Sequence, residues 1–156
     1  LYRCIYNNLK KIGFKRYEIS NFSKFKKYES YHNKIYWKNQ TYDAAGLGAS
    51  GYREETRYVN NSNILKYINK DFSKDSITTL TKKDIIFEEI MLSLRLDEGL
   101  NINNFNKKFG INFIEKYKSQ LNYCIANKLL VVTNANIKTT LKGSLLLNSV
   151  LELFLD

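Results

Sequence analysis

The chain has 156 residues, of which 25 are lysine or arginine and 15 are aspartate or glutamate, so its net charge at pH 7 is +10. This length suits one core, or the end of one domain joined to a small second domain, and we expect the second arrangement. Without a leader-like start or a long apolar run, the sequence predicts no transmembrane segment and a cytoplasmic protein with two free thiols.

The positive charge is spread along the chain. The lysines are scattered and do not form one block, and the sequence is rich in Lys, Asn, Ile, Tyr and Phe and has no proline. This pattern indicates a general compositional bias more than a nucleic-acid-binding tract. A diffuse positive field would still favour the approach of a dicarboxylate ligand.

The first residues predict the end of an α/β barrel. Aromatic and β-branched residues between positions 14 and 22 favour a strand that ends in a loop. A helix followed by a strand is the repeating unit of such a barrel, so we expect its last turn here. The helix is predicted from apolar residues at helical spacing and a glycine at its end, namely Tyr2, Ile5, Leu9, Ile12 and Gly13.

Residues 23–40 lack a clear periodicity and predict a long functional loop. A glycine-rich loop follows at residues 46–51, and Ser62 is expected to cap a short helix. The polar composition of residues 71–80 then indicates a linker. We therefore expect a barrel end over residues 1–70, a linker over 71–80 and a small helical domain over 81–156.

The last segment has the element order of a winged helix. Thr81 with Asp84 predicts a helix start, and Asn101 is expected to cap a helix that Gly110 ends. The further expected elements are a longer helix over residues 113–125, a β-hairpin from residues 129–133 and 137–140, and a final helix over 145–155.

His32 and Trp37 are the only histidine and the only tryptophan, and they lie five residues apart. Imidazole is a common ligand of haem iron, and aromatic rings pack on a porphyrin. Asn33 or a backbone carbonyl would fix the second ring nitrogen, and Tyr36 and Trp37 would shield the macrocycle. The alternative is a hydrogen-bonded structural histidine. The cations expected to pair with propionates are Lys34, Lys38 and Arg53.

The sequence around this motif resembles the radical-SAM HemW haem chaperones, which are relatives of oxygen-independent coproporphyrinogen III oxidase. The resemblance covers essentially the whole chain and implies haem binding at His32, Asn33, Tyr36 and Trp37, with His32 as the iron ligand. It also implies transfer of haem to a client haemoprotein. The matching segments are residues 13–22, 28–30, 32–37 and 46–49, then Arg57, Tyr58, Asn60, Leu94, Arg95, Glu98, Gly99, Phe105, Phe109, Gly110, Thr140, Lys142, Gly143 and Asn148.

The cluster ligands of that family are absent from this chain. Family members hold a [4Fe-4S] cluster on a Cys-x-x-x-Cys-x-x-Cys motif, whereas the only cysteines here are Cys4 and Cys124. We therefore expect the C-terminal part of such a protein, either a fragment or a degenerate copy. The absent cluster-binding half would be its partner, and the chain alone would perform no radical chemistry.

Residues 46–51 formally satisfy the dinucleotide pattern G-x-G-x-x-G, but they lack the flanking strand and long helix that this fingerprint requires. The resemblance instead implies contact with S-adenosylmethionine here. In relatives Ala-His often stands where this chain has Gly-Tyr, so a glycine-rich turn remains the alternative. The residues that would make this contact are Gly48, Ala49, Ser50, Gly51 and Tyr52.

Two other functions compete with the haem chaperone. A fragment of an oxygen-independent coproporphyrinogen III oxidase is the nearer one, although the HNxxYW motif favours the chaperone branch. A winged-helix nucleic-acid-binding module is the other, but Glu115 interrupts its candidate helix and no arginine follows Arg95. The polar residues that this helix offers are Lys116, Lys118, Gln120 and Asn122.

Overall fold

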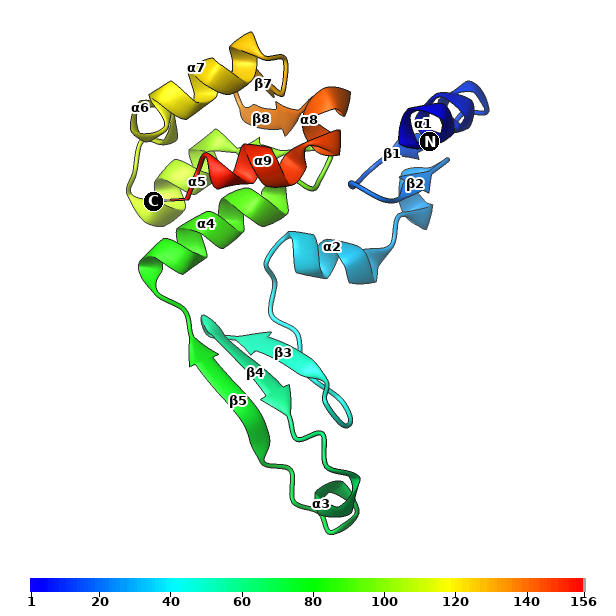
Figure 1. The fold of residues 1–156 in the computed structure, drawn as a ribbon, viewed down its shortest axis with the longest axis vertical. Coiled ribbons are helices and arrows are strands. Elements are labelled where there is room, and N and C mark those ends of the chain that lie inside the picture. Colours follow the sequence, from blue (N-terminus) through cyan, green and yellow to red (C-terminus); the bar gives the residue numbers. More distant parts are fainter. Residues whose placement is uncertain (156) are drawn as a thin grey trace.

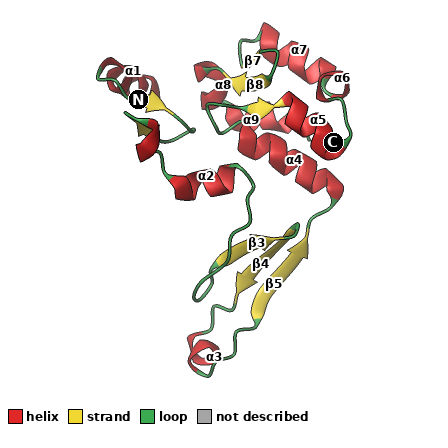
Figure 2. Cartoon of the chain, turned by 180° about the vertical axis from the view of Figure 1, so that it is seen from behind, coloured by secondary structure: helices red, strands yellow, loops and turns green. Residues whose placement is uncertain are grey.

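A computed structural model describes residues 1–155, and they form a mixed helix-and-strand fold (Figure 1). A helical cluster holds the C-terminal half, a three-stranded sheet projects from it, and the N-terminal helix and two short strands lie beside the cluster (Figure 2). The described strands make three small separate sheets and close no barrel. No helix within residues 1–155 combines the length and apolarity needed to cross a membrane.

The N-terminal helix is confirmed, but the single strand expected over residues 14–22 is wrong. The chain reverses there, since the Tyr17 amide donates to the Asn21 carbonyl and the Asn21 amide group donates to Glu18. A polar turn thus replaces the middle of the strand. The elements are α1 (Tyr2–Lys11), β1 (Lys15–Arg16), β2 (Phe22–Ser23), η1 (Lys26–Tyr28) and α2 (Tyr31–Trp37), with β1 and β2 antiparallel.

The histidine motif lies on helix α2 and not in the expected loop. Ser30 caps this helix, because its hydroxyl accepts the Asn33 backbone N–H at 3.3 Å. Seven residues are too few for a visible helical repeat, and none of them is fully buried, so the apolar stripe that marks longer helices is missing. Contacts with the rest of the chain stabilise a helix this short.

Most of the expected linker is a strand. Residues 74–79 form β5, which pairs antiparallel with β4 in the order β3-β4-β5. Every β5 side chain is exposed, so the alternation of buried and exposed residues that predicts a strand is absent.

The cap of the next short helix differs from the expected one. Asn63, not Ser62, caps this helix, because Ser62 donates hydrogen bonds to Asp75 on β5. The remaining bounds are β3 (Ser50–Arg53), β4 (Thr56–Asn60), α3 (Ile64–Ile68) and β5 (Lys74–Thr79).

The C-terminal elements enclose the main core, whose members include Ile90, Cys124 and Val150 at 0% exposure. The expected helix over 113–125 is interrupted at Tyr117, and two short helices replace the expected final one. The hairpin is confirmed, and β6 adds a third strand in the order β6-β8-β7. The bounds are α4 (Lys82–Ser93), β6 (Leu100–Asn101), α5 (Ile102–Phe109), α6 (Phe113–Lys116), α7 (Lys118–Ala126), β7 (Leu130–Val132), β8 (Asn136–Thr139), α8 (Leu141–Leu145) and α9 (Leu147–Glu152).

The predicted ends of α4 and α5 are confirmed. Thr81 and Asp84 form a reciprocal capping box, and hydrogen bonds from Thr81 lower the pKa of the Asp84 carboxyl below its usual value. Asn101 caps α5, and Gly110 ends it in the left-handed conformation with φ +68°. These signals are local, which explains why they are legible in the sequence.

We predict that Thr81→Ala lowers the free energy of unfolding by about 1 kcal/mol, because the first turn of α4 loses its cap. Urea denaturation measures the change. Lys82→Ala is the matched control, since it replaces an exposed side chain in the same turn and should leave the midpoint in place. Equal midpoints for Thr81→Ala and the unchanged chain would contradict the capping role.

Candidate functional site

His32 stands at the exposed end of a row of aromatic side chains. Its ring packs edge-on against Tyr36, with centroids 4.9 Å apart. Tyr36 contacts Tyr42 at 4.5 Å, and Tyr42 lies 6.3 Å from the buried Tyr52. We call these four residues the aromatic row. It runs from helix α2 to strand β3 and fixes the imidazole at the protein surface.

The imidazole nitrogens have no hydrogen-bond partner within residues 1–155. Residues 1–155 therefore supply none of the hydrogen bonds that the structural alternative expects. Tyr36 holds the ring by edge contact and leaves its nitrogens accessible. An exposed imidazole whose lone pair is unused fits the donor required by haem iron.

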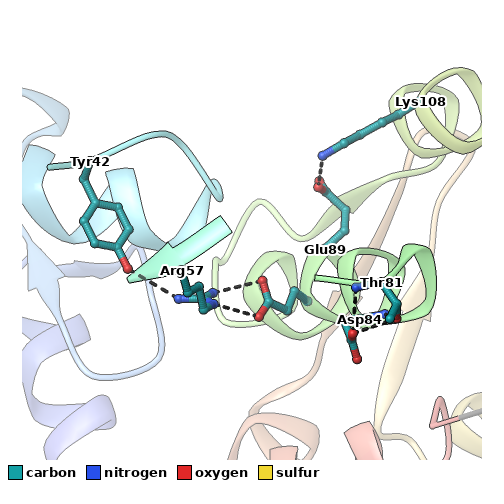
Figure 3. Close-up of polar contacts among 7 residues, drawn as sticks. Tyr42, Arg57, Thr81, Asp84, Glu89 and Lys108 are labelled. Atoms are coloured by element: carbon teal, nitrogen blue, oxygen red, sulfur yellow. Dashed lines mark hydrogen bonds and ion pairs between the residues drawn. The ribbon is translucent and has the colours of Figure 1, made fainter. Parts of the chain in front are cut away.

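Arg57 on β4 ties the aromatic row to the C-terminal core (Figure 3). Its guanidinium lies over the Tyr52 ring at 5.2 Å and donates to the Tyr42 hydroxyl at 3.4 Å. It also donates two hydrogen bonds to Glu88 on α4, at 3.0 and 2.9 Å. These bonds to Glu88 raise the pKa of Arg57 above its usual value.

The Trp37 side chain contacts Arg95 and not the aromatic row. The guanidinium of Arg95, just beyond α4, lies 5.2 Å from the Trp37 ring. Residues four apart share a helix face, so His32 and Tyr36 lie on one face of α2, and Asn33 and Trp37 on another. The structure thus brings together two of the four expected haem-binding residues and places Trp37 against the core.

The expected propionate-binding cations all have carboxylate partners. Lys34 pairs with Glu29, Lys38 with Glu98 at 2.9 Å, and Arg53 with Asp43 at 2.7 Å. The Lys38 and Arg53 pairs are solvent-exposed, and exposed ion pairs contribute little stability. These two cations can therefore exchange a protein carboxylate for one on a ligand at small cost.

The glycine-rich segment leads into a strand, which the dinucleotide fingerprint does not allow. Ser50, Gly51 and Tyr52 lie in β3, and Gly51 faces the Tyr58 ring so closely that a Cβ would be 2.2 Å from Tyr58 Cζ. Tyr58 in turn accepts the Ala44 amide through its hydroxyl. Gly51 thus has a packing role that requires no bound S-adenosylmethionine.

The described residues do not fit an iron–sulfur cluster. Cys4 is exposed and Cys124 is fully buried, where desolvation raises the pKa of its thiol. Within residues 1–155, no group of three or more His, Cys, Asp or Glu side chains could hold a metal ion. Haem differs, because a single axial side chain can hold its iron.

Sequence reasoning did not identify Tyr42, Arg57 or Glu88 as part of this site. Arg57 and Glu88 lie 31 residues apart and on different elements. No spacing rule connects two such residues. The aromatic row crosses from a helix to a strand, so neither helical nor strand periodicity marks it.

We predict that Arg57→Gln lowers the free energy of unfolding by about 1–3 kcal/mol, because it leaves the carboxylate of Glu88, 14% exposed, without its partner. Thermal and urea unfolding measure the loss. Arg53→Gln is the matched control, since it removes an exposed arginine pair from the same sheet. The expected role of Arg57 fails if both variants unfold at the same midpoint.

Comparison with known proteins finds one family model and several curated relatives. Residues 80–146 match the HemN C-terminal domain. Heme chaperone HemW of Lactococcus lactis is 38% identical over 157 residues, which cover 99% of this chain and 41% of the relative. Heme chaperone HemW of Bacillus subtilis is 33% identical over 159 residues, covering 99% of this chain and 42% of the relative. The chain therefore spans about two fifths of the length of these curated relatives.

A solved structure shares the fold. The radical SAM enzyme coproporphyrinogen III oxidase (HemN) from Escherichia coli superimposes with a TM-score of 0.74 over 99% of this chain and 40% of that one. The sequence identity is 14%, so this likeness concerns the fold alone. The chain resembles, from end to end, about two fifths of the HemW haem chaperones, and its residues 80–146 match the HemN C-terminal domain.

Proposed function

We propose that this chain is the haem-binding C-terminal part of a HemW-type haem chaperone and that His32 is its axial haem ligand. The observation that carries the proposal is the exposed imidazole whose nitrogens have no hydrogen-bond partner within residues 1–155. Relatives named as haem chaperones match 99% of the chain, which supports haem as the bound molecule.

The residues of α2 would act in different ways. His32 would donate its nitrogen lone pair to iron, and Tyr36 would hold the imidazole ring by the edge contact at 4.9 Å. Asn33 lies on the other face of α2 and forms no hydrogen bond with the His32 ring within residues 1–155, so the expected orientation of the imidazole by Asn33 is wrong. We propose for Asn33 only a supporting place on the helix beside His32. Trp37 would act indirectly, because its stacking with Arg95 holds α2 on the core.

The propionates of haem would meet positive side chains at α2 and on strand β3. Lys38 and Arg53 hold exposed carboxylates that a propionate can replace, and Lys34 follows His32 by two residues. The net charge of +10 favours the approach of this dicarboxylate from solution. Each surface lysine adds little alone, so we assign most of the affinity to the iron–imidazole bond and apolar packing.

The wider activity belongs to the same proposal. In a whole protein of this kind, haem would pass to a client haemoprotein in the cytoplasm, and the half that precedes these residues would hold the cluster and S-adenosylmethionine. Gly48, Ala49, Ser50, Gly51 and Tyr52 would form the edge of that cofactor site. We likewise propose a boundary near residues 71–80 and a winged-helix-like unit over 81–156, on the basis of the element order after β5.

A fragment of a coproporphyrinogen III oxidase is the second candidate. The shared fold with the Escherichia coli enzyme favours it, at 14% identity. The HNxxYW motif and the higher identity to proteins named as haem chaperones favour the first candidate. The name of the first candidate refers to haem and that of the second to coproporphyrinogen, so haem binding by His32 distinguishes the chaperone most directly.

We predict that ferric haem added to the chain gives a saturable shift of the Soret band, and that His32→Ala weakens binding by at least about tenfold because the iron loses its axial ligand. Cys4→Ser is the control, since Cys4 is the exposed thiol that could bind iron instead. It should titrate like the unchanged chain.

Two results would contradict the proposal. One is an unchanged titration for His32→Ala, and the other is a loss of binding confined to Cys4→Ser. Circular dichroism of each variant confirms that the helices are retained, since His32 is exposed and its replacement should leave the fold intact.

A further inference from the structure

We infer that Arg95 and the groove beside it bind the carboxylate of an apolar acid, at a place separate from His32. The groove lies between Ile19, in the turn that joins β1 to β2, and the residues of α8 and α9, and it has a volume of about 340 Å³. Arg95, Ser144, Asn148 and Ser149 supply polar groups to it, and Ile19 and residues 145–147 supply apolar ones. This combination suits a ligand with one charged end.

Arg95 is the unusual member of this lining. It is half-buried, and its Nε is buried without a hydrogen-bond partner. Its guanidinium forms no ion pair with any of residues 1–155, and its one side-chain interaction is the contact with the Trp37 ring. The Nε of Arg16 is likewise buried without a hydrogen-bond partner, but Arg16 forms an ion pair with Asp97, and Arg57 forms one with Glu88.

An unpaired cation in a partly desolvated position is costly, and proteins normally pair it or direct it to a ligand. Stacking on an aromatic ring stabilises the guanidinium but satisfies none of its N–H donors. Those donors match the two oxygens of a carboxylate in bidentate geometry. Arg95 is therefore preorganised by Trp37 for an anion that the described chain does not supply.

Neither Asp97 nor Glu18 forms an ion pair with Arg95. Asp97 accepts from Arg16, which also donates to Ser144 at 2.7 Å. Glu18, whose backbone bridges Leu96, is buried at 1% exposure and accepts from Asn21 through Oε1, whereas its Oε2 has no hydrogen-bond partner within residues 1–155. The open groove leaves room for a carboxylate from outside, and its leucines favour an aliphatic or aromatic body.

The single tryptophan makes this site measurable. Trp37 contacts Arg95 directly and is the only tryptophan in the chain. The intensity of its fluorescence should therefore change when an anion binds to Arg95. Octanoate is the probe, and methyl octanoate is the uncharged control. We expect a saturable change with octanoate, none with the ester, and about tenfold weaker octanoate binding in Arg95→Gln.

A second pair of variants leaves the Arg95–Trp37 contact in place. Ser149 is exposed and lines the groove, so Ser149→Asp should weaken octanoate binding by repulsion, whereas Ser149→Asn should not. The inference is overturned if Ser149→Asp and Arg95→Gln both bind octanoate as the unchanged chain does. It is also overturned if methyl octanoate produces the same response as octanoate.

The carboxylate has two possible sources, a haem propionate or a separate apolar acid, and a haem titration distinguishes them. If octanoate competes with haem, and Arg95→Gln weakens both, the groove holds a propionate. If Arg95→Gln weakens octanoate alone, the groove holds a separate acid. Both results support a carboxylate site. His32→Ala should retain the octanoate response, so failure of haem ligation at His32 leaves this inference standing.

Discussion

The ion pair between Arg57 and Glu88 joins the projecting sheet to the C-terminal core, and the position of His32 depends on it. Glu88 belongs to α4, which packs in the core, whereas Arg57 lies on the central strand of the sheet. The same guanidinium covers Tyr52 and binds the Tyr42 hydroxyl. One cation thus fixes two members of the aromatic row, and the row places the imidazole.

Helix α2 shows how a short element can serve two partners. Tyr36 contacts Tyr42, which precedes the sheet, whereas Trp37 contacts Arg95, just beyond the core helix α4. Adjacent residues on a helix point about 100° apart, so consecutive aromatic side chains reach different neighbours. These contacts stabilise the seven-residue helix, although none of its side chains is fully buried. The exposed His32 is then presented by a helix that is fixed on both sides.

Local chemistry made much of the fold predictable from sequence. The caps at Thr81 and Asn101 and the stop at Gly110 depend on residues a few positions apart. Strand β5 could not be predicted in the same way, because its stability comes from pairing with β4 and its side chains are all exposed. The loop predicted in place of helix α2 was wrong for a related reason. Tertiary contacts stabilise this short helix, so it lacks the hydrophobic periodicity that marks longer helices in a sequence.

The candidate site was predictable in its residue types more than in its geometry. The HNxxYW motif pointed to His32 and Tyr36, which do lie together. It also suggested that Trp37 would share their ligand, whereas the helix directs Trp37 to Arg95. The support from Arg57 and Glu88 needed the three-dimensional arrangement, because those residues are brought together only by folding.

The central claim is an iron–imidazole bond at residue 32, and the iron–nitrogen stretching band of the ferrous haem complex tests it most directly. His32 is the only histidine, so labelling histidine with nitrogen-15 changes one side chain in the whole protein. The account predicts a resonance Raman band that moves to lower frequency in the labelled complex. A complex that forms but whose band is absent or unmoved would show that another side chain binds the iron.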